Sequence, residues 1–221
     1  MIYITGDTHG EYDTFLNRIY RHPVTKDDTV IVCGDFGFVW DAFPHRRALA
    51  KLAQEPFTIA FVDGNHENFD LLETYPVETW HGGLVHRIAG NILHLMRGQC
   101  FEIEGRQFFA MGGAFSHDKP MRTPSYDWWP QELPSAAEYE TAAATLARCG
   151  HRVDHILTHT VPLSVLHALG ATPDPHEAAL HVFLERVYRE VSFESWYAGH
   201  LHLDRRMGER VQVLFEEVVT L

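Results

Sequence analysis

The chain has 221 residues, 45% of them hydrophobic, so it is long enough to bury a full core as a single α/β domain over residues 1–221. It contains no run of about 18 apolar residues that could span a bilayer, and its first residues lack the basic start and apolar segment of a secretory signal. We therefore expect a cytoplasmic protein that does not enter a membrane. The formal net charge of -12 argues against the broad basic surface that binding to duplex nucleic acid requires.

The numbers of cysteines and histidines do not by themselves identify a functional site. Cys33, Cys100 and Cys149 are widely spaced and include no CxxC pair, so neither a disulfide framework nor a thiolate zinc site is indicated. We expect reduced, packed thiols. The 16 histidines are a source of metal ligands and proton carriers, but their number does not locate a site.

The first third of the chain alternates apolar runs with stretches of helical spacing. Short runs rich in β-branched and aromatic residues predict buried strands at 1–5, 29–33 and 57–62. The apolar spacing between them predicts helices over 12–20 and 45–54. This β-α-β-α-β order favours parallel strands joined by right-handed crossovers.

The remainder of the chain changes character at residue 84. Four short apolar segments between 84 and 112, separated by turn signals, predict antiparallel strands on a second sheet. Ser135 and Glu138 form a capping box that begins a helix ending near Cys149. The elements predicted after it are a strand at 154–159, a helix at 177–189, a segment at 196–202 and a closing strand near 210–219.

Polar motifs follow the ends of five predicted strands. They read GDTHG at 6–10, GD at 34–35, GNHE at 64–67, TH at 158–159 and GHLH at 199–202. Groups just beyond the carboxyl ends of parallel strands converge on one crevice, so residues far apart in sequence can meet there. Carboxylates and neutral imidazoles, with an amide oxygen, suit divalent Mn, Fe, Mg or Zn.

This ordered set of motifs resembles that of the calcineurin-like metallophosphoesterase superfamily, and it extends from Asp7 to His202. One such motif occurs by chance in turns, whereas five in order, each at a predicted strand end, are specific. The resemblance implies an α/β fold, a four-layer α/β/β/α sandwich of two mixed sheets, with a two-metal centre.

The resemblance also implies which residues bind two divalent metal ions, Mn, Fe, Mg or Zn. One ion would be bound by Asp7, His9, Asp35 and His202, and the other by Asp35, Asn65, His159 and His200. Asp35 would bridge the two, because a carboxylate has two oxygens that two cations can share. His200 and His202 are two residues apart, so on an extended backbone both would point to the same side.

The reaction implied by the resemblance is hydrolysis of a phosphate monoester or diester. A hydroxide bridging the two metals would attack phosphorus in line. His66, adjacent to the ligand Asn65, would act as the general acid that protonates the leaving oxygen.

One motif departs from the branch of the superfamily that dephosphorylates phosphoserine and phosphothreonine. There the second motif continues as GDxxDRG, whereas here it reads GDFGFVW at 34–40. The carboxylate that orients the acid histidine and an arginine that binds phosphate are both missing, which disfavours a protein phosphatase. The candidates for orienting His66 are then Asp63, Glu67 and Asp118, and each is equally consistent with a solvated or turn carboxylate.

The proline-rich stretch at 114–134 is the candidate substrate-side loop. Arg122 offers a guanidinium for phosphate, and Trp128 offers an aromatic face on which a base or other flat leaving group could stack. At least one of Trp128 and Trp129 is expected to pack on the core instead. Further candidates for supporting the ligands are Ser116, His117 and Asp118.

The sequence thus predicts a binuclear metal-dependent phosphoesterase acting on a small phosphorylated or nucleotide-like substrate. A nuclease or a cyclic-nucleotide phosphodiesterase is the enzymatic alternative, although the acidic balance and the lack of a basic stripe count against a nuclease. A non-catalytic scaffold with the same fold is the alternative from another class, since fold does not fix function. Such a scaffold would be expected to lose ligands, whereas every expected position is filled here.

Overall fold

The computed structural model describes residues 1–221, which form thirteen strands, six α-helices and three short 3₁₀ helices. One sheet contains β1 (Ile2–Thr5), β2 (Thr29–Cys33), β3 (Thr58–Val62), β4 (Val77–Trp80), β5 (Gly83–Ala89), β6 (Ile92–Leu95) and β13 (Val218–Thr220). The other contains β7 (Gln99–Ile103), β8 (Arg106–Met111), β9 (His155–Thr158), β10 (Ser195–Ala198), β11 (Arg205–Met207) and β12 (Val211–Val213). The helices are α1 (Tyr12–Ile19), α2 (Phe43–Leu52), α3 (Phe69–Leu72), α4 (Ala136–Arg148), α5 (Leu163–Ala168) and α6 (Ala178–Glu190), with η1 (Lys119–Met121), η2 (Pro130–Glu132) and η3 (Pro175–Glu177).

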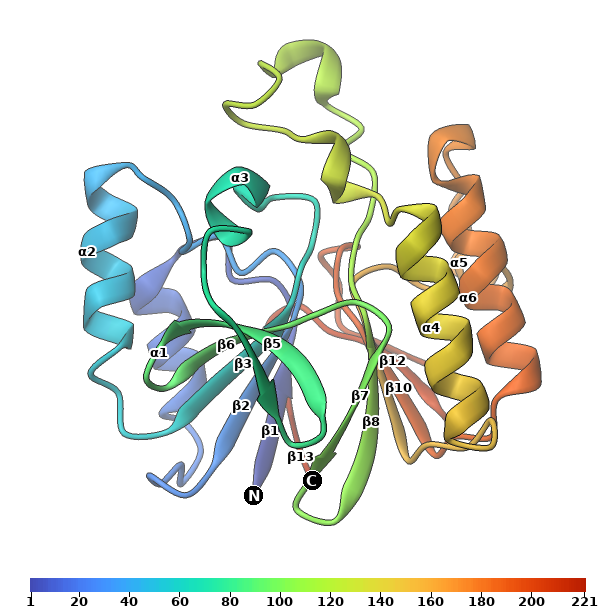
Figure 1. The fold of residues 1–221 in the computed structure, drawn as a ribbon, viewed down its shortest axis with the longest axis horizontal. Coiled ribbons are helices and arrows are strands. Elements are labelled where there is room, and N and C mark those ends of the chain that lie inside the picture. The colour runs from blue at the N-terminus through green and yellow to red at the C-terminus, as the bar shows by residue number, and fades with distance from the viewer.

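The two sheets pack face to face, and helices cover the outer face of each (Figure 1). The first sheet has the order β13-β1-β2-β3-β6-β5-β4, and α1 and α2 lie outside it. The second has the order β11-β12-β10-β9-β8-β7, and α4, α5 and α6 lie outside it. Both sheets are mixed, so the fold is the predicted four-layer α/β/β/α sandwich.

Alternating side chains of the central strands enter two different hydrophobic cores. Ile4 and Ile31 pack between the sheets in a cluster with Leu157, while Val32 packs on the outer side in a cluster with Phe15 of α1. A third core lies between the second sheet and its helices. Because β1 and β2 are buried on both faces, they read as continuous apolar runs in the sequence.

The strands β4 and β11 were not predicted, and the arrangement of the predicted strands differs in two places. Residues 84–112 were expected on one second sheet, but β5 and β6 join the first sheet, where β6 pairs in parallel with β3. The single closing strand predicted near 210–219 is two strands, β12 and β13, on different sheets. In the segment between these two strands, the backbone N–H groups of Phe215, Glu216 and Glu217 donate hydrogen bonds to the carboxylate of Asp204.

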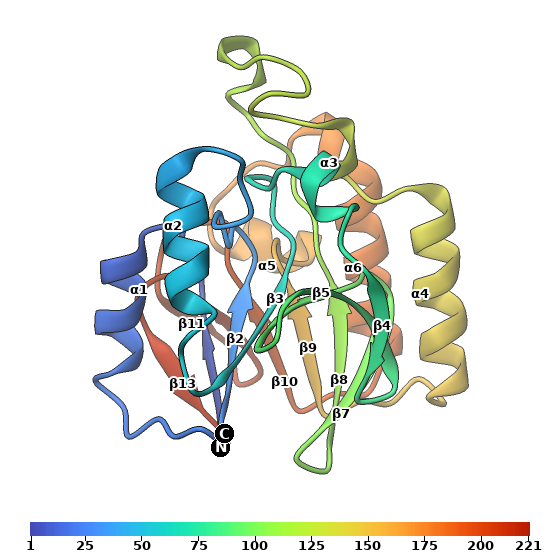
Figure 2. The ribbon, with the colours of Figure 1, turned by 60° about the vertical axis from the view of Figure 1, so that its left-hand side comes forward.

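The strand ends that carry the polar motifs all lie at one end of the molecule. β1, β2 and β3 are parallel to one another, and so are β8, β9 and β10. In Figure 2 the arrowheads of β2, β8 and β9 point to the same end, which the loop at 114–134 overhangs. No helix combines the length and the hydropathy that a membrane span requires.

Candidate metal centre

Four of the predicted ligands converge at this end of the sandwich. Asp7 follows β1, Asp35 follows β2 and His202 follows β10, and together with His9 they place one ligand atom each within 4.8 Å of one another. Nε2 of His202 lies 3.1 Å from Oδ2 of Asp7, and Nδ1 of His9 lies 3.9 Å from Oδ2 of Asp35. Both carboxylates are almost completely buried. This group of two carboxylates and two imidazoles could hold a divalent cation.

The geometry of this group fits a cation better than it fits hydrogen bonds alone. Nε2 of His9 and Nε2 of His202 face each other at 3.0 Å, so only one of them can donate to the other. Oδ2 of Asp7 is buried and accepts no hydrogen bond. A buried carboxylate oxygen without a donor is costly unless a positive charge compensates it.

Two further predicted ligands, Asn65 and His159, meet at the other carboxylate oxygen of Asp35. Nε2 of His159 lies 3.1 Å from Oδ1 of Asn65 and 3.3 Å from Oδ1 of Asp35. The other ring nitrogen of His159 donates to the carbonyl of Cys33 at 2.9 Å, and the amide nitrogen of Asn65 donates to Ser116 at 3.1 Å. These outer bonds fix both side chains, so that one nitrogen and two oxygens are directed at one point.

The charges at this point depend on one another. Burial opposes ionisation of Asp35, but the neighbouring His159, His66 and His9 outweigh it and hold the pKa of this carboxyl well below its usual range. Burial likewise disfavours a charged His159, but Asp35 and Asp7 raise its pKa to about 10. Without a metal ion, a proton on His159 compensates the charge of the two carboxylates. A bound metal ion would take over this role and release the proton.

The backbone at the ligands adopts a conformation that L residues rarely take. His9, Asp35, His200 and His202 have φ angles of 46°, 46°, 67° and 48°, all in the left-handed region. The extended backbone predicted around His200 and His202 is therefore wrong: tight left-handed turns direct these side chains. Such strain persists where surrounding contacts hold it, and it concentrates at functional sites.

Gly64 shows how closely the third motif approaches the second. A methyl group at this position would lie 2.0 Å from Oδ1 of Asp35, so only glycine fits. The close approach also brings the backbone N–H of His66 to the same oxygen, to which it donates a hydrogen bond at 2.8 Å.

The imidazole of His66 lies at the edge of this centre. Its Nε2 is 4.0 Å from Oδ2 of Asp35 and 3.3 Å from Nη2 of Arg122, which comes from the overhanging loop. Arg122 is itself held by the carboxylate of Asp118 at 2.7 Å and by the carbonyl of Asp127 at 2.8 Å. Burial, with the neighbouring Arg122, lowers the pKa of His66 below its usual value.

The three candidates for orienting His66 have different partners in the structure. Asp63 contacts His94 at 3.0 Å and Arg97 at 2.9 Å. Glu67 accepts hydrogen bonds from the backbone N–H groups of Phe36 and Gly37, at 2.7 and 3.3 Å, and so supports the turn that carries Asp35. Asp118 reaches His66 only through Arg122.

His200 has neighbours that the motifs did not indicate. Its ring lies beside that of His159, with centroids 4.9 Å apart, but it also forms a second potential metal-binding group with His117 and Glu177. Glu177 ends η3, and its sequence neighbourhood resembles an ordinary helix start. Only the packing of α6 against the second sheet brings it to the centre.

The two tryptophans of the loop occupy different environments. Trp129 is buried and packs edge-on against Trp40, with ring centroids 5.5 Å apart. Trp128 is half-buried, and Nζ of Lys119 lies over its ring, 4.4 Å from the centroid. Trp129 is thus the tryptophan that packs on the core, and Lys119 covers one face of Trp128.

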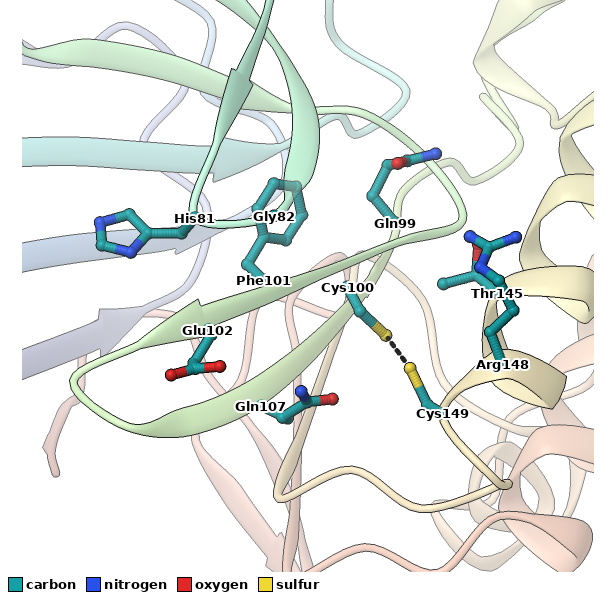
Figure 3. A pocket seen from close by; sticks show the side chains of 10 residues that line it. All are labelled: His81, Gly82, Gln99, Cys100, Phe101, Glu102, Gln107, Thr145, Arg148 and Cys149. Carbon is teal, nitrogen blue, oxygen red and sulfur yellow. Dashed lines mark hydrogen bonds between the residues drawn. The ribbon is translucent and has the colours of Figure 1, made fainter.

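The structure also has cavities away from the metal centre. One, of about 480 Å³, lies between β7 and the end of α4, and no predicted site residue lines it (Figure 3). In its wall Cys100 and Cys149 place their sulfur atoms 3.4 Å apart as free thiols. Another, of about 630 Å³, lies over the Asp63 and Arg97 pair.

Comparisons with known proteins give one family match. No curated protein sequence matches the chain at a significant level. Among solved structures, the crystal structure of phosphopantetheinyl hydrolase from Mycobacterium tuberculosis is similar over 97% of this chain and 87% of that chain, with 18% sequence identity and a TM-score of 0.49. The family described as calcineurin-like phosphoesterase matches residues 1–204, which include every residue of the centre. The chain therefore belongs to the calcineurin-like phosphoesterase family.

Proposed function

We propose that this protein is a binuclear metal-dependent phosphoesterase that hydrolyses a small phosphate ester. The observation that carries the proposal is the convergence of Asp7, His9, Asp35 and His202, from three strand ends, within 4.8 Å. Family membership supports phosphoester hydrolysis as the reaction class.

The proposal assigns two divalent cations to two sides of Asp35. Asp7, His9, Asp35 and His202 hold one, and Asp35, Asn65, His159 and His200 hold the other. The facing nitrogens of His9 and His202, 3.0 Å apart, support the first assignment, and so does the buried Oδ2 of Asp7, which has Nε2 of His202 3.1 Å away but accepts no hydrogen bond. The convergence of His159, Asn65 and Asp35 supports the second. When bound, the pair of cations acidifies a water for attack on phosphorus and stabilises charge on the phosphoryl oxygens.

The remaining groups of the site handle the proton and the phosphate. His66 is assigned the role of donating a proton from Nε2, which lies 4.0 Å from Oδ2 of Asp35, to the leaving oxygen. Because a guanidinium can only donate a hydrogen bond, Arg122 must leave this nitrogen before it carries the proton. Arg122 lies at hydrogen-bond distance from the same nitrogen, so a phosphate that enters here can draw the guanidinium onto its own oxygens. Asn65 keeps its oxygen directed at the centre through its bond to Ser116.

The substrate is proposed to be small, phosphorylated or nucleotide-like. The net charge of -12 gives no basis for tracking a long polyanion. Trp128 offers one half-buried aromatic face in the overhanging loop, on which a flat leaving group could stack after Lys119 moves.

The test is hydrolysis of a chromogenic aryl phosphate monoester and the matching diester, with Mn²⁺, Mg²⁺, Zn²⁺ or chelator added. We expect metal-dependent turnover that the chelator abolishes and that Asp35→Asn eliminates. Asp13→Asn, an exposed carboxylate on α1, is the matched control and should retain full activity.

The outcomes separate the competing functions. Preference for the diester would direct the search to cyclic nucleotides and nucleic-acid ends, and preference for the monoester would direct it to small phosphorylated metabolites. Turnover that survives complete chelation would contradict metal dependence. If the protein takes up no metal and hydrolyses no ester, the result would instead support a scaffold.

A further inference from the structure

A buried acid–imidazole pair lies behind His200. Glu177, at the end of η3, and His181, in the first part of α6, are 3% and 1% exposed. Oε2 of Glu177 lies 3.2 Å from Nε2 of His181, and the other ring nitrogen of His181 donates to the carbonyl of Val161 at 2.9 Å. The backbone N–H of Phe115 donates to Oε1 of Glu177 at 3.3 Å. The Glu177 carboxylate therefore accepts a backbone hydrogen bond on one side and lies beside His181 on the other, and His181 can donate to it only when both of its ring nitrogens carry hydrogen.

This carboxylate faces His200. A ring nitrogen of His200 and a carboxylate oxygen of Glu177 lie within 4.8 Å of each other. The backbone N–H of His200 donates to Asp7 at 3.0 Å, but no side-chain hydrogen bond orients its ring. Of the two ring nitrogens, one can bind a cation, and the other then carries a hydrogen that requires an acceptor.

His117, the third member of this group, is a poor candidate for that acceptor role. Its side chain is 59% exposed, and its Nδ1 lies 3.3 Å from Asp174 on the solvent side. The ring of His117 is nearly parallel to that of His200 and 6.2 Å from it, so the two rings are not in hydrogen-bonding contact. Glu177 is the buried carboxylate that remains, and burying a carboxylate is costly unless its charge is used.

We propose that Glu177 is a positioning residue that accepts a hydrogen bond from the ring N–H of His200 and thereby orients His200 towards the second metal position. His181 and the N–H of Phe115 hold Glu177 in place. Rotation of the His200 ring, or a slight shift of the loop that carries it, closes the remaining gap. This inference rests on the proposed function, because it takes His200 as a ligand of the second cation.

The test is a calorimetric titration of the metal-free full chain with Mn²⁺ alone, for wild type and Glu177→Gln. We expect two binding steps in the wild type. In the variant the first step should be unchanged and the second weakened by about 10- to 100-fold, the usual effect of losing a partner of a metal-bound histidine. Glu190→Gln, an exposed carboxylate on the same helix, is the control and should leave both steps unchanged.

Three further variants sharpen the result. Glu177→Ala should weaken the second step at least as much, and Glu177→Asp should partly restore it, with the thermal unfolding of the metal-free chain measured to confirm that each variant folds. His117→Ala should leave both steps unchanged. If it weakens the second step as much as Glu177→Gln does, a cation is held by His117, Glu177 and His200 together, and the positioning role is wrong.

The remaining outcomes distinguish this inference from the function it rests on. Two unchanged steps in both Glu177→Gln and Glu177→Ala would overturn the role of Glu177 while leaving the binuclear centre intact. Loss of both steps in a folded Glu177→Gln chain would also overturn it, because the effect would not be specific to His200. A wild type that binds no Mn²⁺ would overturn the proposed function itself.

Discussion

Single residues at this centre are held by bonds that point away from it. His159 donates to Cys33, Asn65 donates to Ser116, and Glu67 accepts from the turn that carries Asp35. Each outer bond leaves a ligand atom directed inward and restricts its movement. Preorganisation of this kind lowers the cost of placing charged groups around a cation and a phosphate.

At this scale His66 can be tested directly. His66→Ala should lower kcat by about 10²- to 10⁴-fold, the usual contribution of a general acid. The loss should be larger for an alkyl phosphate than for an aryl phosphate, because the aryl leaving group needs less help from a proton. The measurement is kcat for both esters, with His167→Ala, an exposed histidine on α5, as the control. An equal loss for both leaving groups would contradict the acid role.

Arg122 should influence both the phosphate and the acid. Burial and Arg122 lower the pKa of His66, and a general acid acts only while it is protonated, so activity should fall as pH rises through that pKa. Removing the guanidinium in Arg122→Met should raise this pKa, move the alkaline limb of the profile to higher pH and increase KM. A pH profile of kcat/KM checks the shift. An alkaline limb that stays in place would show that Arg122 does not act on His66.

The residues of the centre differ in how far the sequence could predict them. Asp7, Asp35 and Asn65 follow apolar runs that read clearly as strands, so their convergence follows from the parallel order alone. Glu177 lies in a polar stretch before a helix, where acidic residues are common for reasons of capping. Its place beside His200 depends on how α6 packs, which local sequence does not encode.

Among the elements, the end of β3 is joined to the loop by a buried ion pair. Arg97, between β6 and β7, donates to Asp63 at 2.9 Å and to the carbonyl of Gln131 at 2.7 Å. Burial opposes ionisation of Asp63, but Arg97 and His94 outweigh it and hold the pKa of this carboxyl well below its usual range. The pair thus connects the strand that carries Asn65 to the segment that overhangs the site.

Removing the cation of this pair should destabilise the fold. Arg97→Met leaves the buried carboxylate of Asp63 with His94 as its one remaining partner. Loss of one member of a buried ion pair lowers the free energy of unfolding by about 3–5 kcal/mol. Because the pKa of Asp63 is depressed in the folded state, its ionised carboxylate contributes to stability at pH values above the pKa of the unfolded chain, and this contribution is lost as pH falls. The difference in free energy of unfolding between wild type and variant should therefore narrow below about pH 4.

Urea unfolding at pH 7 and at lower pH measures this difference. Arg47→Met, which removes an exposed cation on α2, is the control and should change the free energy of unfolding by less than about 0.5 kcal/mol. A cost for Arg97→Met that is independent of pH would show that packing, and not the charge of Asp63, is what the variant loses.

The elements themselves were predicted best where their pattern is local. The strands β1, β2 and β3 and the capping box of α4 were found because burial on both faces and capping leave marks within a few residues. The assignment of β5 and β6 to a sheet was wrong, because an antiparallel hairpin has the same pattern in either sheet. The short helices α3 and α5 were missed, since four to six residues give too little periodicity.

For the whole molecule, the four layers explain why the site lies where it does. Two sheets packed face to face bring the carboxyl ends of β1, β2 and β3 beside those of β9 and β10. Ligands separated by almost the full chain length therefore meet in one place. The acidic balance of the chain is consistent with the proposed function, in which bound cations would supply positive charge where the reaction needs it.

The most direct test of the two-metal centre is a crystal structure of the protein with Mn²⁺, with anomalous scattering recorded for the metal. We expect two anomalous peaks about 3.5–4 Å apart, as in other two-metal sites, one on each side of the Asp35 carboxylate. A single peak, or a second peak that lies between His117 and Glu177 and away from Asp35, would contradict it.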